Sequence, residues 1–513
     1  MNQQEQKLQR SENLTSTKIE TNEQENFYIQ LFITGCLAEA TYYIESNKEA
    51  VVIDPLRDTE PYVKLAQDRG AQIKYVMLTH IHADFVSGHL DLSKKTGAQI
   101  VYGPTAELGF KAHVAQNQEV FELSDKVKIQ LLHTPGHTRE SSTYLLLNQD
   151  KPYCIFTGDT LFLGEVGRPD LAVKSGDITK EDLAGWLFDS LNNVIKQLPD
   201  ELIVYPGHGA GSACGKNIQK GSSDSLGNQK KTNYALKIEE RNEFIKQVSS
   251  NLPTPPGYFF HDVSVNKQGY DDLENVLKKA FVPLKAEQFE NLVNNEKYTI
   301  IDSRDKFEYL KGFIKGSYSI DYKGAFAAWL GKLVSPKDKF VLICEEGKEY
   351  EVIVRMARIG YDNIAGYLEG GVNAYKAAGH ELQTVKSIEA KDFEPIILQE
   401  EKKDFKIIDV RDPNEKVKGY LDDSVMEPVW GLEERLKANP NLFDHNQTLY
   451  LMCQSGQRSL PASSIFTKYG YKNLVHVIGG FNEVSKLKVP ISYAQCPLEA
   501  ARLLKQQQQE QKA

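Results

Sequence analysis

Four short motifs place histidine and aspartate side chains directly after apolar, strand-like runs. They are Thr79-His-Ile-His-Ala-Asp84, His133-Thr-Pro-Gly-His-Thr138, Gly158-Asp-Thr160 and Pro206-Gly-His-Gly209. Imidazole and carboxylate groups suit a first-row divalent metal, and loops at strand ends hold such ligands rigidly because the sheet lies behind them. One His-x-His motif alone would be weak, since a lone histidine more often caps a helix or fills a core. Four such elements in one chain predict a metal site.

A second candidate site is the loop Cys453-Gln-Ser-Gly-Gln-Arg-Ser459, which lies between an apolar run and a helical run. Backbone N–H groups that turn inward around the cysteine, with the positive end of a helix dipole, make a cradle for an anion. Arg458 adds positive charge, so the loop should favour a thiolate at Cys453 and stabilise a persulfide there. Phosphatases of the Cys-x5-Arg class use a similar cradle. Here four residues separate the cysteine and the arginine, which favours sulfane sulfur over phosphate.

The metal motifs resemble those of the metallo-β-lactamase superfamily, an αββα sandwich with its metal site at one edge of the paired sheets. The resemblance covers about residues 26 to 250. The usual first motif is His-x-His-x-Asp-His, and this chain has Phe85 in place of the last histidine. A second metal would normally use Asp84, that missing imidazole and His208. The departure therefore weakens the two-zinc arrangement of hydrolytic members and favours a mononuclear site.

Within the superfamily, three segments resemble persulfide dioxygenases fused to rhodaneses: His82-Ala-Asp-Phe-Val-Ser-Gly-His89, Gly167-Arg-Pro-Asp170 and Gly211-Ser-Ala-Cys-Gly-Lys216. The resemblance implies one Fe(II) per chain, with zinc as the alternative, held by His80, His137 and Asp159. Two histidines and one carboxylate leave three positions open on one face of the metal, enough for O2 and a persulfide sulfur. Around these ligands, the residues expected to fix tautomers and hydrogen-bond bound water are His82, Asp84 and His208.

Two further residues are candidates for substrate contact. By the same resemblance Arg168 binds a carboxylate of the thiol carrier, and the alternative is a solvated loop residue. Cys214 lies six residues beyond His208 in a glycine-rich loop. We expect it close to the iron, where it would accept or relay sulfur, and the alternative is an ordinary partly buried thiol.

The second half of the chain contains an internal repeat, which indicates the elements that must hold the cysteine loop. Leu342-Ile-Cys-Glu-Glu-Gly347 corresponds to Leu451-Met-Cys-Gln-Ser-Gly456, and Gly370-Gly371 to Gly479-Gly480, both 109 residues apart. Two copies of one domain therefore lie in tandem. Each alternates short β-rich runs with helical segments, which predicts a parallel sheet with crossover helices. The second copy resembles a rhodanese, a sulfurtransferase that carries sulfane sulfur on Cys453.

The first copy keeps a cysteine at the matching position but changes the charge around it. Alignment of Cys344-Glu-Glu-Gly-Lys-Glu-Tyr350 on the cysteine loop puts Glu349 where the second copy has Arg458. Glu345 and Glu346 add negative charge that should oppose thiolate formation and repel sulfite or thiosulfate. This copy is therefore expected to be a rhodanese fold without rhodanese activity. The alternative is that Lys348 restores the anion site and Cys344 accepts sulfur.

At 513 residues the chain exceeds what one hydrophobic core usually serves. We expect an α/β multidomain protein, with the first boundary at the Pro-rich stretch 252–257. The polar ends are predicted to be disordered. The expected parts are a tail at 1–26, a metallo-β-lactamase-like persulfide dioxygenase domain at 27–252, a degenerate rhodanese-like domain at 258–383, an active rhodanese domain at 390–490 and a tail at 500–513.

The formal charge of −9 gives no basic field for nucleic acid or an anionic membrane. No apolar run approaches membrane-spanning length, and the first 26 residues resemble neither a secretory nor a transit peptide. Six cysteines without dense spacing fit a reducing compartment. The expected location is therefore cytoplasmic, without nucleic-acid or membrane partners, and a homo-oligomer stays open.

The two candidate sites together indicate a non-heme iron persulfide dioxygenase. It would oxidise low-molecular-weight persulfides with O2 to sulfite and thiol. The rhodanese would form thiosulfate from sulfite, or in reverse would deliver persulfide to the iron. Two alternatives remain: a zinc-dependent hydrolase of the glyoxalase II type, because one fold serves both chemistries, and a sulfur carrier whose N-terminal metal domain is a scaffold.

Overall fold

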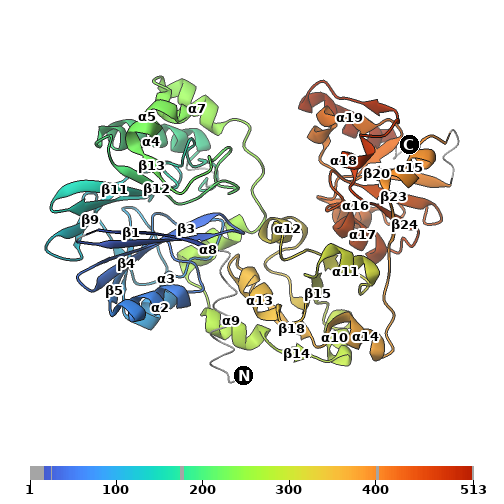
Figure 1. The fold of residues 1–513 in the computed structure, drawn as a ribbon. Helices are drawn as coiled ribbons and strands as arrows, with labels where there is room; N and C mark the ends of the chain where they lie inside the picture. Colours follow the sequence, from blue (N-terminus) through green and yellow to red (C-terminus); the bar gives the residue numbers. More distant parts are fainter. Residues whose placement is uncertain (1–16, 25, 174–177, 400–403, 511–513) are drawn as a thin grey trace. The chain divides into compact units, whose positions relative to one another are not determined.

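The computed structural model describes residues 17–24, 26–173, 178–399 and 404–510 (Figure 1). The chain divides into two compact units, Met1–Lys278 with Ile353–Asp362, and Lys279–Val352 with Asn363–Ala513. Within the described ranges, no helix has both the length and the apolar character needed to cross a bilayer.

Two sheets form the centre of the first unit (Figure 1). One has seven strands in the order β1 to β7, and the other has six in the order β13-β12-β11-β10-β9-β8. Their facing sides share one core of aliphatic and aromatic side chains, including Tyr42 and Phe156. The strands are β1 (Thr17–Glu23), β2 (Tyr28–Thr34), β3 (Glu39–Ser46), β4 (Glu49–Ile53), β5 (Gln72–Met77), β6 (Gln99–Tyr102), β7 (His113–Val114), β8 (Val120–Glu122), β9 (Val127–His133), β10 (Ser142–Asn148), β11 (Lys151–Gly158), β12 (Ile203–Pro206) and β13 (Asp224–Ser225).

Helices cover the outer face of each sheet with apolar sides. On the first sheet they are α2 (Glu60–Arg69) and α3 (His89–Thr96), which bury Tyr62 and Leu92. On the second sheet Leu187 and Phe244 belong to the outer core, and the helices are α4 (Lys180–Asn193), η1 (Ile195–Gln197), α5 (Leu226–Thr232), α6 (Tyr234–Lys237) and α7 (Arg241–Ser249). The expected αββα sandwich is thus confirmed, with its strands ending where the sequence places the metal motifs.

The second unit contains two parallel sheets with the same strand order. They are β14-β18-β17-β15-β16 and β19-β24-β23-β20-β22. The first repeat comprises β14 (Pro283–Leu284), α10 (Ala286–Asn294), β15 (Thr299–Asp302), α11 (Lys306–Lys311), β16 (Tyr318–Ser319), α12 (Phe326–Leu333), β17 (Phe340–Ile343), α13 (Glu349–Ala357), β18 (Ile364–Leu368) and α14 (Gly371–Ala377). The second comprises β19 (Lys386–Ile388), α15 (Ala390–Ile397), β20 (Phe405–Asp409), η2 (Pro413–Lys418), β21 (Tyr420–Leu421), β22 (Ser424–Met426), α16 (Leu432–Ala438), β23 (Thr448–Met452), α17 (Ser459–Lys468), β24 (Leu474–Val477), α18 (Phe481–Val484), β25 (Ile491–Ser492) and α19 (Pro497–Glu510). The tandem repeat is confirmed.

Both predicted tails are shorter in the structure. Thr17–Glu23 forms β1, antiparallel to β2, because its alternating β-branched and polar residues suit an edge strand. The rest of that tail, residues 1–16, lies outside the described residues. At the other end residues 500–510 belong to α19, where the side-chain amide of Gln507 accepts from the Met426 N–H and donates to the Ser424 carbonyl, both at 3.0 Å. The helix therefore has a tertiary partner that its Gln-rich composition did not indicate.

The predicted domain boundaries also need correction. The first unit continues past residue 252 into α8 (Phe259–Gln268), and it includes Ile353–Asp362 from the first repeat. The second repeat begins before residue 390, because β19 is its edge strand. The physical reason for the first correction is the backbone of the metal loop 82–87, whose buried polar groups need partners. The Asn266 side chain donates to the carbonyls of His82 (2.9 Å) and Phe85 (2.7 Å).

Segment 353–362 is held to the rest of the first unit by two charge pairs, one of them buried on both sides. The Arg358 guanidinium donates to both carboxylate oxygens of Asp58 at 2.7 Å. The backbone carbonyl of Arg358 accepts from the Val86 N–H at 2.7 Å. Arg57 pairs in the same way with Asp362, at 2.7 and 2.9 Å. These bidentate pairs explain why the unit recruits a segment from far along the chain.

Removal of the Arg358 guanidinium is expected to destabilise the first unit. Arg358→Ala leaves the buried Asp58 carboxylate without its partner, which typically costs about 3–5 kcal/mol. The exposed pair between Arg241 and Asp189 offers a matched control, since Arg241→Ala should cost about 1 kcal/mol or less. Hydrogen exchange of peptides from the first unit, followed by mass spectrometry in increasing urea, measures both values. Equal losses in the two variants would contradict the expected role of segment 353–362.

Candidate functional site

His80, His137 and Asp159 meet at one edge of the two sheets. They follow β5, β9 and β11, and each is at most 2% exposed. The Asp159 Oδ2 atom lies 3.4 Å from His137 Nε2 and 4.0 Å from His80 Nε2. This buried oxygen has no hydrogen-bond partner among the described residues. Ligand bonds of first-row ions to nitrogen and oxygen are about 2.0–2.2 Å long, so three atoms at this spacing fit one bound ion.

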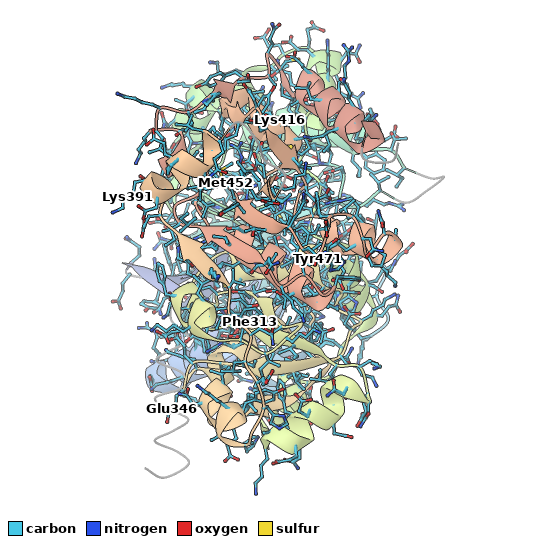
Figure 2. All side chains as sticks on the ribbon, turned by 90° about the vertical axis from the view of Figure 1, so that its right-hand side faces the viewer. Phe313, Glu346, Lys391, Lys416, Met452 and Tyr471 are labelled. Atoms are coloured by element: carbon cyan, nitrogen blue, oxygen red, sulfur yellow. The ribbon has the colours of Figure 1, made fainter. Side chains whose placement is uncertain are left out.

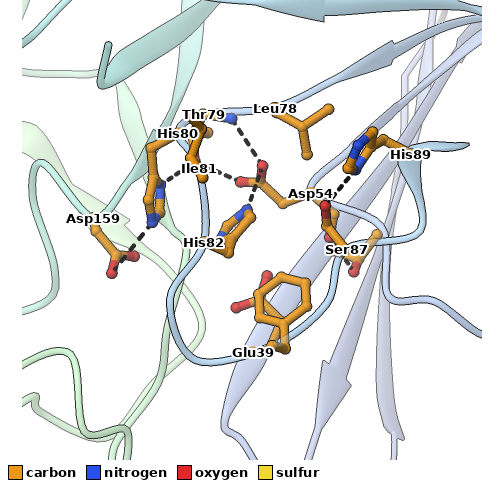
Figure 3. A network of polar contacts seen from close by, with 12 residues as sticks. Glu39, Asp54, Leu78, Thr79, His80, Ile81, His82, Ser87, His89 and Asp159 are labelled. Carbon is orange, nitrogen blue, oxygen red and sulfur yellow. Dashed lines mark hydrogen bonds and ion pairs between the residues drawn. The ribbon is translucent and has the colours of Figure 1, made fainter. Parts of the chain in front are cut away.

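Hydrogen bonds turn both histidines toward that point. The His137 Nδ1–H donates to the Arg168 carbonyl at 2.7 Å, which leaves Nε2 as the free ring nitrogen. The Thr79 hydroxyl donates to Asp54 Oδ2 at 2.7 Å, so its oxygen accepts from His80 Nδ1 at 2.9 Å (Figure 3). In both rings the tautomer leaves the Nε2 lone pair available for a metal.

His208 occupies the neighbouring position and is held by carboxylates. Its Nδ1 lies 2.8 Å from Asp159 Oδ1, and its Nε2 lies 2.7 Å from Asp84 Oδ2 and 2.8 Å from Glu39 Oε2. Burial lowers the pKa of His208. The acidic neighbours Asp159, Asp84 and Glu39 outweigh burial and raise this pKa well above its ordinary value. The contacts with Asp159 and Asp84 are hydrogen bonds, and all three distances are shorter than the 3.4–4.0 Å that separate Asp159 Oδ2 from the Nε2 atoms of His137 and His80. His208 thus acts as a cationic partner of Asp159.

His82 lies beside the three ligands and does not join them. Its Nε2 is 3.0 Å from Asp54 Oδ1 (Figure 3), and this carboxylate raises the pKa of His82 to about 9 against the opposing effect of burial. The ring packs on Phe85 with 4.3 Å between ring centroids, and Phe85 is fully buried. The residue that replaces the usual second-metal histidine therefore fills its place with an apolar ring.

The three residues expected around the ligands act in two chains of contacts. His82 contacts Asp54, which holds Thr79 and through it His80. Asp84 contacts His208, which holds Asp159. Sequence reasoning missed Asp54, Thr79 and Glu39. Asp54 and Thr79 had a signal, since both follow β-strands beside a metal motif. Glu39 lies far from every motif, and an isolated bridge between the two backbones brings it to His208.

The Arg168 guanidinium is only 3% exposed, so the alternative of a solvated loop residue is wrong. It donates to both Asp170 oxygens at 2.7 Å, to the Pro253 carbonyl at 2.6 Å and to the Ala213 carbonyl at 3.3 Å. It therefore joins the loops around the site, and a substrate carboxylate would have to replace one of these acceptors. Contact with a thiol carrier stays a prediction.

Cys214 lies against the same site. Its sulfur and ligand atoms of Asp84 and His208 are all within 4.8 Å of one another. The thiol is buried, and burial raises its pKa well above the ordinary value, with Asp84 adding to the effect. The expected proximity to the metal centre is supported, and a neutral thiol is the state that this environment favours.

Comparisons with known proteins agree with this arrangement. Residues 34–208 match the metallo-beta-lactamase superfamily, and residues 285–378 and 395–487 match the rhodanese-like domain. A solved metallo-beta-lactamase from Staphylococcus aureus subsp. aureus COL is 31% identical and superposes with a TM-score of 0.60. The alignment covers 67% of this chain and 99% of that one. The chain belongs to the metallo-beta-lactamase superfamily.

Other similar proteins carry different names. Two relatives in Schizosaccharomyces pombe, both with hydroxyacylglutathione hydrolase in their names, are 31% and 30% identical over 32% of this chain. The chain covers 60% of the length of each. A structure of ETHE1 from Myxococcus xanthus is 27% identical, with 47% of this chain and 98% of that one covered. Its TM-score of 0.40 is too low to carry a functional argument.

In the second rhodanese-like domain, Cys453 follows β23, whose last residue is Met452 (Figure 2). The backbone N–H groups of Gly456 and Arg458 donate to its sulfur at 3.1 and 3.2 Å. Gly456 has a φ of +84°, the left-handed conformation that lets the loop curve inward. The expected cradle of inward-pointing amides is therefore present.

The Arg458 guanidinium is directed elsewhere. It pairs with Glu415, with one contact at 2.7 Å, and with Asp412 at 3.3 Å. Its contribution to the loop is therefore made chiefly by its backbone N–H, with its charge partly neutralised by these carboxylates.

The cysteine loop of the first rhodanese-like domain differs from that of the second in the contact made by the Gly347 amide. Gly347 corresponds to Gly456, but its N–H donates to the Glu349 carboxylate at 3.2 Å. Burial raises the pKa of the Cys344 thiol above its ordinary value, and Glu349 adds to the effect. Lys348 pairs with Glu351 at 3.2 Å, which opposes its suggested rescue of the anion site. Glu346, exposed in this loop and labelled in Figure 2, adds negative charge.

Cys344 is expected to remain unmodified under conditions that load Cys453. In Cys453→Ser incubated with glutathione persulfide, mass spectrometry should find no stoichiometric persulfide on Cys344, because its thiol is neutral and lacks the donor that Glu349 takes. The wild-type chain, labelled at Cys453, serves as the control. Rapid, stoichiometric labelling of Cys344 would refute the inactive-domain interpretation.

Proposed function

We propose that this chain is an iron-dependent persulfide dioxygenase coupled to a sulfurtransferase. The overall reaction is RSSH + O2 + H2O giving RSH and sulfurous acid, which ionises to sulfite. Iron, when bound, supplies the site at which O2 and the terminal sulfur react. The substrates are low-molecular-weight persulfides, and the rhodanese loop would combine sulfite with sulfane sulfur to form thiosulfate or run in the opposite direction.

One observation carries this proposal: the ligand atoms of His80, His137 and Asp159 are open, whereas in the neighbouring group of Asp84, His208 and Cys214 the imidazole already lies against two carboxyl groups. Asp159 Oδ2 is left unpaired next to two ring nitrogens, whereas His208 Nε2 already lies within 2.7–2.8 Å of two carboxylate oxygens. Phe85 then removes the imidazole that hydrolytic members use for a second ion. A mononuclear centre with two histidines and one carboxylate fits O2 chemistry.

The chain's own residues hold and orient this centre. His80 and His137 present Nε2 because Thr79 and the Arg168 carbonyl occupy their Nδ1 atoms. His208 keeps Asp159 ionised. Burial alone would raise the pKa of Asp159, but His208 and His137 lower that pKa below its ordinary value. The cysteine loop supports the second half of the proposal, since a persulfide on Cys453 would face the same two N–H donors.

A hydrolase of the glyoxalase II type is the second candidate. The hydroxyacylglutathione hydrolase names of the Schizosaccharomyces pombe relatives favour it. Against it stand the closed second position and the fused rhodanese-like domains, which give a thioester hydrolase no task. A sulfur carrier with a scaffold metal domain would load Cys453 and consume no O2.

The metal centre is expected to bind one iron per chain. His137→Ala should lose both the iron and persulfide-dependent O2 uptake, because it removes one of three ligands. His133→Ala is a matched control in the same motif: its Nε2 contacts the Arg139 carbonyl and not the metal ligands, so both properties should persist. Metal analysis after anaerobic purification, with an O2 electrode and sulfite determination, checks this. Two zinc ions per chain with thioester hydrolysis would establish the hydrolase instead.

The two chemistries are expected to separate by substitution. Cys453→Ser should leave O2 uptake largely intact, because the metal ligands lie in the other unit, and should shift the products from thiosulfate toward sulfite. Ion chromatography of sulfite and thiosulfate measures the ratio, with Cys344→Ser as the matched control that leaves it unchanged. If Cys453→Ser stopped O2 uptake outright, the two sites would share one obligatory sulfur relay.

A further inference from the structure

The Ser459 hydroxyl contacts both the sulfur of Cys453 and the ring of His476. The Ser459 hydroxyl oxygen is 3.9 Å from Cys453 Sγ and 2.9 Å from His476 Nδ1. The hydroxyl can also donate to the Gly456 carbonyl at 3.2 Å, so this oxygen competes with the sulfur for the serine hydrogen. His476 belongs to β24, and its ring lies below the loop, because a Cβ placed on Gly456 would be 3.2 Å from His476 Cε1. Three separate elements thus converge on one hydroxyl.

The protonation of the ring decides where the serine hydrogen points. Burial, with a smaller effect of Lys306, lowers the pKa of His476 to about 4, so the imidazole is neutral at physiological pH and carries one N–H. With that proton on Nδ1, the ring donates to Ser459, and the serine hydrogen can point to the sulfur or to the Gly456 carbonyl. With it on Nε2, Nδ1 would take the serine hydrogen away. An anionic sulfur favours the first arrangement, because hydrogen bonds to charged acceptors are the stronger ones.

We propose that His476 is a positioning residue that acts through Ser459 to give the sulfur of Cys453 a third hydrogen-bond donor. This donor adds to the N–H groups of Gly456 and Arg458. It stabilises the thiolate and the terminal persulfide anion in a loop whose arginine charge is partly neutralised by Glu415 and Asp412. The inference rests on the proposed sulfurtransferase role of this loop and extends it to a residue on another strand.

The two copies of the domain provide an internal comparison. At the same spacing of 109 residues, the first copy has Tyr350 in place of Ser459 and Tyr367 in place of His476. Both tyrosines pack on Phe281, with ring centroids 5.9 and 5.4 Å from it. The copy whose loop amide is taken by a glutamate thus also lacks the hydroxyl–imidazole pair, and uses the positions for packing.

The test is the pH profile of alkylation of Cys453 by iodoacetamide in the full-length protein, with the Cys453 peptide quantified by mass spectrometry. His476→Leu should move the midpoint up by about one pH unit, roughly the loss of one hydrogen bond to a charged group. His476→Asn should restore the wild-type midpoint, because its amide reaches the position of Nδ1. His476→Gln places its amide near the position of Nε2 and should not restore it.

The double substitution separates action through the serine from any other cause. In a Ser459→Ala background, which itself raises the midpoint, His476→Leu should cause no further change. His445→Leu, which removes another histidine of the same domain, should leave the profile unaltered. Additive shifts, an unchanged midpoint in His476→Leu, or equal behaviour of the Asn and Gln variants would overturn the proposal.

Because alkylation needs no sulfur donor, the test is independent of the proposed function. If the midpoints move as expected while the wild-type chain loads no sulfane sulfur, the positioning role stands and the sulfurtransferase assignment is wrong. If Cys453 loads sulfur and the midpoints do not move, the sulfurtransferase assignment stands and the positioning role of His476 is wrong.

Discussion

The buried carboxylate of Asp159 is the group on which the metal centre depends. An ionised carboxylate in a dry interior is costly unless charge and hydrogen bonds compensate it. His208 compensates one oxygen at 2.8 Å, and the other is left for a cation. His208 in turn needs Asp84 and Glu39, so the ion pairs extend outward from one oxygen atom. The oxygen without a hydrogen-bond partner among the described residues is the atom that a bound cation would contact.

The rigidity of this centre comes from outside the strands that supply its ligands. Loop 82–87 follows the first metal motif, and its backbone is tied by Asn266 from α8 and by the Arg358 carbonyl. Both contributors lie beyond residue 208, where the match to the superfamily ends. An added helix and a segment from the first repeat therefore hold a loop that in an isolated domain would need other partners or water. Segment 353–362 of the first repeat therefore supports the metal loop through a backbone hydrogen bond, whether or not that repeat is catalytic.

The sequence alone predicted the elements that are both periodic and local. The β-rich runs, the strand-end motifs, the repeat spacing and the cysteine loop all appear in the structure. Contacts between distant positions could not be predicted in the same way. No motif near Glu39 indicates that it contacts His208. Likewise, the residue pattern of 353–362 does not indicate that Arg358 pairs with Asp58 in the first unit. Composition predicts disorder for the polar, Gln-rich end, because it does not indicate that the Gln507 side chain hydrogen-bonds the backbone of β22.

The two rhodanese-like domains share their strand order and differ around the cysteine loop. Each keeps the strand order, the glycine pair and a buried Asp–Arg pair, Asp302 with Arg304 and Asp409 with Arg411. In both, the arginine also donates to a glycine carbonyl eight residues on, at 2.9 Å. Those pairs are therefore structural. The loops differ in an amide contact, since Gly456 donates to sulfur and Gly347 donates to Glu349, and in the replacement of Ser459 by Tyr350. In the first copy a carboxylate of the loop itself therefore accepts from the amide that faces sulfur in the second copy.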